Sequence, residues 1–550
     1  MNIMLKQPSY THGASSKPLL GTTIGKNLKN TVQKFPDREA LVSLHQNYRA
    51  TYQEFWDQTT EVAKALIANG ITPGDRVGIW APNRYEWVLL QYATARIGTI
   101  LVNINPSYRT NELKFALNQS GVRILISQLA FKTNDYRDMV GEVAQFCPEL
   151  KETIYFEVNW KSFLATGQSV MEEKLQQFES MVQFDHAVNI QYTSGTTGFP
   201  KGVTLSHNSI LNNGYFVGER LHYTEKDRVC IPVPFYHCFG MVIGNLACTT
   251  HGSCIVIPSE SFNAEETLDA VQKEKCTSLY GVPTMFIAVL GLPNFDEYNL
   301  SSLRTGVMAG SPCPVEVMKQ VQSKMYMKEV SICYGMTETS PVSTQTVIGT
   351  PLAKQVSTVG TIQDHLEIKI IDPDTGQIVE RGTPGEVCTR GYSVMIKYWN
   401  DPQATKEAID EGNWMHTGDL GIMDEEGYVN ISGRIKDVII RGGENISPRE
   451  IEEFLHTNPF IEDVHIIGVP DEKFGEEIMA WVKIRKGETV TPEDLNRFCK
   501  DKIAYYKVPR YWRFVDEFPT TVTGKIRKVE MRKIATKELN LEGLLDIKTS

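Results

Sequence analysis

The stretch YTSGTTGFPKGVTLSH, residues 192–207, joins two segments in which apolar and polar side chains alternate. Residues 187–193 (AVNIQYT) lead into it, and residues 202–207 (GVTLSH) end it. Alternation with a period of two is typical of half-buried strands, and the glycines between the two segments favour a turn. The sequence therefore predicts two strands joined by a glycine-rich hairpin loop.

This loop also has the composition of a phosphate-binding site. Its backbone amides and hydroxyl groups are those of an anion-binding nest, and Lys201 adds a positive charge. The spacing is not that of a Walker P-loop, because Gly202 follows the lysine and Pro200 disfavours a helix at Phe199. A flexible polar hairpin explains the same residues equally well when the stretch is taken alone.

Composition and charge exclude several classes of protein. The chain has 550 residues, 41% hydrophobic and 22% charged, which is typical of a globular protein with several domains. A net charge of -10, without a run of lysine and arginine, argues against nucleic-acid binding. Ten cysteines without a C-x-x-C pair or a zinc spacing indicate reduced thiols.

The N-terminal sequence bears on location. It lacks the apolar core of a secretory signal, and no apolar run in the chain approaches the ~18 residues of a transmembrane helix. It contains lysines and no acidic residue before Asp37, but a mitochondrial transit peptide is richer in arginine. We expect a cytoplasmic protein, with the mitochondrial matrix as the alternative.

Strand-like and helical segments alternate from residue 51 onward. The residues TYQE at 51–54 form a capping box that opens a helix through Ala68. A second alternating run covers residues 253–334. This pattern predicts an α/β fold with parallel sheets covered by helices, in which ligands bind at the carboxyl ends of strands. The first strands are expected at 76–81, 99–105 and 123–128, with helices at 84–98 and 110–121 between them.

The pattern changes after Ile431. A charged, loop-rich stretch is followed by Ser447, which we expect to cap a new helix in a box with Glu450. Further strands are expected at 463–470, 477–486 and 510–516, with a helix from Thr491. About a hundred residues of this kind predict a second, smaller α+β domain.

Further polar motifs accompany the loop. They are PVPFYHCFGM (232–241), CYGMTETSP (333–341), HTGDLG (416–421), GRIKDVIIRGGEN (433–445) and PTTVTGKIRK (519–528). Each motif alone has an ordinary structural explanation, such as a core histidine, a helix cap, a turn aspartate or a solvated lysine. Their combination and their order argue for one functional site.

In this combination the chain resembles the acyl-activating, AMP-forming enzymes, which include acyl-CoA synthetases, luciferases and nonribosomal adenylation domains. The resemblance runs from about Thr23 to Arg532 and rests on TSGTTGFPKG, YGMTE, TGD, GRIKD, RGGEN and TGKIRK. Within the family, the chain is similar to the acyl-CoA synthetase family member 2 group and its bacterial relatives, which handle medium-chain fatty acids. One departure is Lys397 in MIKYWN, where the family commonly has glycine, and it lies outside the chemical motifs.

The resemblance implies a reaction in two steps. A carboxylate attacks the α-phosphorus of ATP in the presence of Mg²⁺, and CoA then displaces AMP from the acyl-adenylate to give a thioester. The resemblance also implies an adenylate-forming domain with layered parallel sheets over residues 1–432, a hinge at 433–437 that includes Lys436, and a mobile α+β lid domain over 438–550. Monomer and homodimer both stay open.

The resemblance also assigns roles to single residues. Tyr334 would stack on adenine, Asp419 would accept the ribose hydroxyls, and Lys525 would bridge the fatty carboxylate and the α-phosphate. The expected catalytic residues are Lys525, His237 and Thr337, and the expected metal ligand is Glu338. The residues expected to bind ATP or CoA are Thr193, Ser194, Gly195, Thr196, Thr197, Gly198, Phe199, Pro200, Lys201, Gly310, Ser311, Tyr334, Gly335, Asp419, Arg434, Gly442 and Gly443.

Two alternatives stay open at the level of sequence. An amino-acid-activating domain carries an aspartate near the segment FYHCFG, where this chain has Phe235 and Tyr236, so a fatty or aromatic acid fits better. A non-catalytic nucleotide sensor would not need Lys525, Glu338 and Asp419 together. The small residues Gly240, Gly281, Gly310, Cys333 and Gly335 leave room for an acyl tunnel of undetermined depth.

Overall fold

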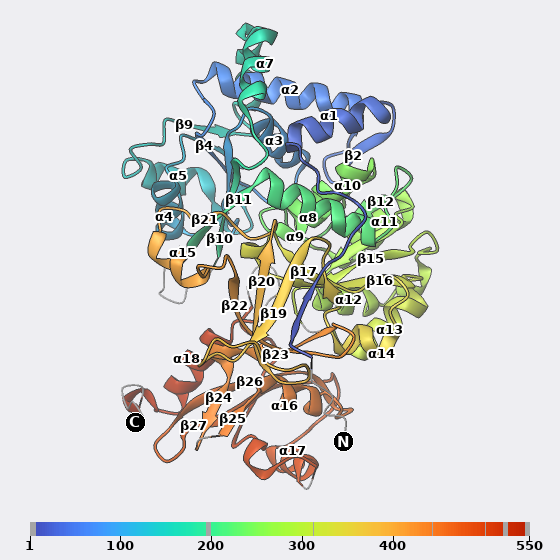
Figure 1. The fold of residues 1–550 in the computed structure, drawn as a ribbon, viewed down its shortest axis with the longest axis vertical. Coiled ribbons are helices and arrows are strands. Elements are labelled where there is room, and N and C mark those ends of the chain that lie inside the picture. Colours follow the sequence, from blue (N-terminus) through green and yellow to red (C-terminus); the bar gives the residue numbers. More distant parts are fainter. Residues whose placement is uncertain are drawn as a thin grey trace. The chain divides into compact units, whose positions relative to one another are not determined.

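The computed structural model describes residues 7–193, 200–311, 313–442, 444–500, 502–520 and 526–544. The chain forms two compact units (Figure 1). The larger unit comprises Tyr10–Lys369 and Cys388–His416, and the smaller comprises Met1–Ser9, Ile370–Val387 and Thr417–Ser550. Three of the boundaries fall inside strands, namely β19 (Leu366–Ile371), β20 (Gly385–Gly391) and β22 (Met415–Met423).

The predicted hairpin lies in a seven-stranded sheet of the larger unit. The strand order is β21-β11-β10-β5-β4-β6-β9. The strands are β4 (Arg76–Trp80), β5 (Ile100–Asn103), β6 (Ile124–Ser127), β9 (Glu152–Tyr155), β10 (Ala187–Thr193), β11 (Lys201–Ser206) and β21 (Lys397–Tyr398). β10, β5, β4, β6 and β9 run parallel, as the alternation predicted, whereas β10 and β11 are antiparallel with Thr193 opposite Lys201. Both strands of the hairpin are confirmed, while its loop residues 194–199 lie outside the described residues.

A second sheet of the larger unit has nine strands in the order β18-β17-β16-β15-β14-β12-β13-β2-β3. Its strands are β2 (Glu39–Ser43), β3 (Tyr48–Thr51), β12 (Arg228–Cys230), β13 (Cys254–Ile257), β14 (Ser278–Gly281), β15 (Thr305–Ala309), β16 (Glu329–Gly335), β17 (Val342–Gln345) and β18 (Thr361–Ile362). The six strands from β16 to β2 are parallel, and the pairs at both ends are antiparallel. The motif that begins at Cys333 therefore starts at the carboxyl end of β16.

Helices pack between and around these sheets (Figure 1). Helix α3 (Tyr85–Arg96) is buried from Glu86 to Arg96, as expected of a helix enclosed on all sides. One core cluster joins buried residues of α3 and of both sheets, including Trp87, Val203 and Ile255. The other helices of this unit are α1 (Ile24–Lys34), α2 (Tyr52–Ala68), α4 (Thr110–Ser120), α5 (Tyr136–Ala144), α6 (Trp160–Thr166), α7 (Glu172–Met181), α8 (His207–Arg220), α9 (Cys238–Gly240), α10 (Ala247–His251), α11 (Ala264–Glu274), α12 (Pro283–Leu290), α13 (Val315–Lys324), α14 (Leu352–Ser357) and α15 (Pro402–Ala408).

The smaller unit is built on a sheet with one helix layer on each face. Its strands are β24 (Ile439–Arg441), β25 (Glu444–Ile446), β26 (Ile461–Asp471), β27 (Gly475–Ile484) and β28 (Tyr511–Phe514). Ile478 and Ala480 join one buried cluster with α16 (Pro448–Leu455) and α17 (Pro492–Cys499), and Met479 and Trp481 join another with α18 (Lys528–Glu538). Because side chains alternate along a strand, one strand serves both clusters. The predicted α+β domain is confirmed as a fold.

The helix starts test the capping predictions. Thr51 and Glu54 form the predicted capping box of α2. Ser447 is the N-cap of α16, as predicted, but its box with Glu450 is wrong: Ser447 Oγ donates to Ser432 O at 2.6 Å instead. Across the described parts of the chain, no helix combines the length and the apolar character needed to cross a membrane.

Candidate active site

Much of the expected phosphate-binding loop falls in a part of the chain that is not described. Ser194, Gly195, Thr196, Thr197, Gly198 and Phe199 lie outside the described residues, and so do Gly443 and Lys525. The two ends of the loop are described, because Thr193 closes β10 and Lys201 opens β11. Pro200, next to Lys201, is partly buried. The structure therefore places the two strand ends that border residues 194–199.

Glu338 lies beside these strand ends. The chain leaves β16 at Gly335 and turns through a short 3-10 helix, Thr337–Thr339, in which Thr337 and Glu338 are 6% and 5% exposed. Thr193 Oγ1 donates to Glu338 Oε1 at 3.3 Å. The structure therefore brings together the expected metal ligand and the start of the expected phosphate loop, which are 145 residues apart in the sequence.

Tyr398, to which no sequence motif pointed, completes the cluster of Thr193, Lys201 and Glu338. Tyr398 OH donates to Glu338 Oε1 at 2.9 Å, and Lys201 Nζ lies 4.9 Å from the centroid of the Tyr398 ring. Tyr398 follows Lys397, which departs from the family pattern. The sequence therefore singled out Lys397 but gave no reason to select Tyr398. No spacing rule connects Tyr398 with a carboxylate 60 residues earlier in the chain.

The cluster has the chemistry of a cation site next to an anion site. A buried carboxylate and a hydroxyl oxygen are hard oxygen donors of the kind that Mg²⁺ prefers. Lys201 supplies the positive charge that a phosphate group needs. These residues of the larger unit therefore fit Mg²⁺ together with a phosphate ester.

Glycine positions near this cluster allow close approach of the backbone. A Cβ on Gly335 would lie 1.8 Å from Pro341 O, which no side chain tolerates. Tyr334, just before it, is partly buried at the end of β16.

Gly310 and Ser311 follow β15, whose residue Ala309 is in register with Cys333 of β16. The loops after β15 and β16 therefore leave adjacent strands at their carboxyl ends. This matches the placement expected for ligands of parallel sheets.

His237 lies at the start of α9. Its Nδ1 accepts a hydrogen bond from Phe239 N at 3.1 Å, so the neutral ring carries its proton on Nε2. Cys238, next to it, is fully buried, and its Sγ contacts Gln191 Oε1 at 3.2 Å. Burial raises the pKa of the Cys238 thiol, so this group stays protonated and is no nucleophile at neutral pH.

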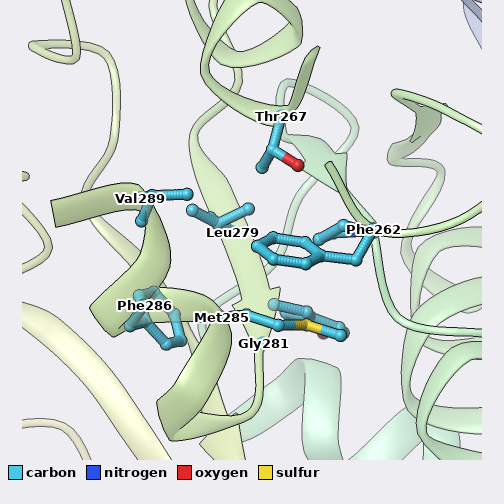
Figure 2. A pocket seen from close by; sticks show the side chains of 9 residues that line it. Phe262, Thr267, Leu279, Gly281, Met285, Phe286 and Val289 are labelled. Atoms are coloured by element: carbon cyan, nitrogen blue, oxygen red, sulfur yellow. The ribbon is translucent and has the colours of Figure 1, made fainter. Parts of the chain in front are cut away.

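An apolar cavity lies between β14 and α12 (Figure 2). Its volume is about 10 Å³, which holds one water molecule at most. Gly281 borders it, and a Cβ there would lie 3.0 Å from the Phe286 ring. The side chains of Phe262, Leu279 and Met285 surround the space in Figure 2. Of the small residues expected around an acyl tunnel, Gly281 borders this cavity, which in this conformation is too small for an acyl chain.

The smaller unit brings together Asp419, expected at the ribose hydroxyls, and Arg434, expected to bind the nucleotide. Asp419 in β22 and Arg434 in β23 (Val429–Arg434) are partners in an antiparallel pair, and Arg434 Nε donates to Asp419 Oδ1 at 3.0 Å. Asp419 is 7% exposed. Gly442 follows β24 with a φ of 60°, a left-handed conformation that favours glycine. Lys436, in the turn Ile435–Asp437, is exposed.

Comparison with known proteins covers nearly the whole chain. Residues 28–399 match the model of the AMP-binding enzyme family, and residues 450–525 match that of the AMP-binding enzyme C-terminal domain. YngI of Bacillus subtilis (strain 168), provisionally named an acyl-CoA synthetase, is 46% identical over 545 residues, 96% of this chain and 99% of YngI. The mitochondrial medium-chain acyl-CoA ligase ACSF2 of Danio rerio is 44% identical over 560 residues, 97% of this chain and 91% of the relative.

A solved structure has a similar fold. ATP-bound MatB from Rhodopseudomonas palustris superposes with a TM-score of 0.83 at 26% identity, over 94% of this chain and 100% of MatB. The expected fold class is thereby confirmed over both units.

Proposed function

This chain belongs to the AMP-binding enzyme family, and from this premise we propose that it is an ATP-dependent acyl-CoA synthetase acting on a medium-chain fatty acid. The observation that carries the proposal is 44% identity to a medium-chain acyl-CoA ligase over 97% of the chain. The products are acyl-CoA, AMP and pyrophosphate. ATP, Mg²⁺ and CoA are the cofactor and co-substrates of this reaction.

The chemistry explains why two steps are needed. A free carboxylate is a poor acyl donor, because its leaving group would be oxide. Attack of the carboxylate on the α-phosphorus of ATP forms a mixed anhydride with AMP and releases pyrophosphate. The CoA thiol then attacks the acyl carbon and expels AMP. Because the first step brings two anions together, the protein must supply positive charge where they meet.

The cluster around Glu338 is proposed to serve this first step. Glu338 would ligate Mg²⁺, which when bound neutralises phosphate charge. The loop from Thr193 to Lys201 would hold the β- and γ-phosphates, and Thr337 would contact the α-phosphate. The buried Glu338 carboxylate, with a threonine hydroxyl at 3.3 Å, supports this assignment.

The remaining roles are also proposals. Tyr334 would stack on adenine, Asp419 would accept the ribose hydroxyls, and Arg434 would contact the nucleotide beside them. The ion pair between Arg434 and Asp419 supports a joint role. Lys525 would bridge the carboxylate and the α-phosphate, and His237 would lie by the acyl group. Gly310, Ser311 and Gly335 would line the nucleotide, and Gly442 and Gly443 the path of the thiol.

The proposed domains are an adenylate-forming domain over residues 1–432, a hinge at 433–437 and a lid domain over 438–550. The match of residues 450–525 to a separate C-terminal domain model supports a boundary before residue 450. We also propose a cytoplasmic location, with the mitochondrial matrix as the alternative, since the Danio rerio relative is named as mitochondrial.

Pyrophosphate release with a graded series of fatty acids tests the proposed function. The expected result is a maximum near octanoate, followed by formation of octanoyl-CoA once CoA is added. Release with amino acids instead, without thioester formation on CoA, would favour a carrier-loading domain. The absence of an aspartate at Phe235 and Tyr236 supports the first outcome. Binding of ATP without pyrophosphate release for any acid would favour a nucleotide sensor.

A further inference from the structure

Residues 395–399 are bonded to two parts of the candidate site. On one side, Met395 N donates to the backbone O of Glu338 at 2.8 Å. On the other side, β21 pairs antiparallel with β11, and Tyr398 lies opposite Val203. β11 is the strand that leaves the phosphate loop. The segment therefore ties the turn that carries Glu338 to the strand that follows the loop.

Tyr398 makes the contact at the level of side chains. It is 5% exposed, and its hydroxyl donates to Glu338 Oε1 at 2.9 Å. The phenol hydroxyl is the donor in this contact, because an ionised carboxylate can only accept a hydrogen bond. With both groups buried, water competes little for this hydrogen bond, which is stronger than it would be in solvent.

The ring of the same tyrosine contacts the cation of the loop. Lys201 Nζ lies 4.9 Å from the Tyr398 ring centroid, within the range of a cation–π interaction. One side chain thus touches the carboxylate through its hydroxyl group and the ammonium through its ring. Within the described residues, the hydrogen bonds to the Glu338 carboxylate come from Tyr398 and Thr193, and both end on Oε1.

From these contacts we propose that Tyr398 is a positioning residue that orients the Glu338 carboxylate for Mg²⁺ and holds Lys201 beside the phosphate loop. Since both donors among the described residues bond to Oε1, the Oε2 atom would be the one to ligate the cation. The inference rests on the proposed function, in which Glu338 is the metal ligand. Groups that hydrogen-bond a metal ligand fix its orientation, and their removal typically weakens metal binding by 10–100-fold.

Calorimetric titration with α,β-methylene-ATP tests this role without any turnover. The full chain and Tyr398→Phe are each titrated once with Mn²⁺ and once with EDTA. We expect Tyr398→Phe to bind the nucleotide about tenfold more weakly with Mn²⁺ and nearly as well as wild type with EDTA. In pyrophosphate release, the Mg²⁺ dependence of Tyr398→Phe should move to higher concentration.

Tyr52→Phe is the matched control. The Tyr52 hydroxyl is fully buried and donates to Ser253 O at 2.7 Å, so this variant also loses one buried phenol hydrogen bond, but far along the chain from Glu338. It should bind nucleotide as the wild type does under both conditions. In a Glu338→Gln background, Tyr398→Phe should cause little further loss, because the tyrosine acts through that carboxylate.

Two results would overturn the inference. Equal nucleotide affinity of wild type and Tyr398→Phe with Mn²⁺ would remove Tyr398 from the site, and an equal loss with Mn²⁺ and with EDTA would make its role purely structural. Failure of the proposed function looks different: the wild type would release no pyrophosphate with any acid. A Mn²⁺-dependent difference between the variants would then still support the positioning role.

Discussion

At the scale of single residues, the site depends on a few buried charges. Glu338 is 5% exposed and accepts two hydrogen bonds on one oxygen. Asp419 is 7% exposed and pairs with Arg434. A buried carboxylate is costly unless a cation or several donors compensate it, so such positions are strong candidates for ligand contact. The charge at each of these positions can be tested separately.

Replacement of Lys525 by alanine should abolish adenylation and largely spare thioester formation. The loss of one preorganised charge near the transition state predicts a fall on the order of 10²–10³ in the rate of pyrophosphate release. Single-turnover assays with fatty acid and ATP, and separately with synthetic acyl-AMP and CoA, measure the two steps. If both steps slow by the same factor, Lys525 is no specialist of the first step.

Replacement of Glu338 by glutamine should weaken activity in a way that excess Mg²⁺ partly restores. Glutamine keeps the size of the side chain but loses the charge that holds a hard cation. The measurement is the Mg²⁺ dependence of pyrophosphate release, which should shift to higher concentration. A curve that coincides with the wild type would remove Glu338 from the metal site.

At the scale of elements, the ends of strands determine where the side chains of the candidate site lie. Thr193 closes β10, Lys201 opens β11, and Glu338 follows β16 in a turn of three residues. The short strand β21 joins these ends because its backbone pairs with β11. A rigid scaffold of this kind positions side chains more accurately than a free loop does. Changes to the backbone between elements should therefore affect function selectively.

The turn Ile435–Asp437 offers such a test at Lys436. If Lys436 is the hinge, its backbone torsions change during the reaction, so Lys436→Ala should be mild. Lys436→Pro fixes φ near -65° and removes an amide donor. We expect single-turnover pyrophosphate release to persist while thioester formation collapses. Equal loss of both steps in a variant that is folded by circular dichroism would contradict a hinge at 433–437.

At the scale of the whole molecule, two units share one chain. The larger unit holds the seven-stranded and the nine-stranded sheet and the Glu338 cluster, and the smaller holds the pair of Asp419 and Arg434. The domain limits and the hinge at 433–437 stay predictions. The effect of a bound ligand on thermal stability can be measured on the full chain.

ATP with Mg²⁺ should stabilise the larger unit against heat. A ligand at about 100 times its Kd adds about 2.7 kcal/mol to the free energy of unfolding, a shift of a few degrees in Tm for a unit of this size. Differential scanning calorimetry with ATP should show this shift with Mg²⁺ and a smaller one with EDTA. In Glu338→Gln the two conditions should differ less; an undiminished difference would place the metal elsewhere.

The sequence by itself determined the α/β alternation and most strands, because these depend on residues that are close together in the chain, and the order of its motifs determined the family. The hairpin strands on either side of the phosphate loop and the capping box at Thr51 are of this kind. The box at Ser447 failed because a tertiary partner, Ser432 O, takes its hydroxyl. Local patterns carry no information about such competition.

Only the tertiary structure decided that Tyr398 belongs to the site. Its partner Glu338 is 60 residues away, and the contact arises because β21 adds to the edge of one sheet while Glu338 follows a strand of the other. Sequence periodicity reports which face of an element is buried, but not which distant element covers it. The packing of the two sheets against each other determines this, since it alone places the side chains of Tyr398 and Glu338 within hydrogen-bonding distance.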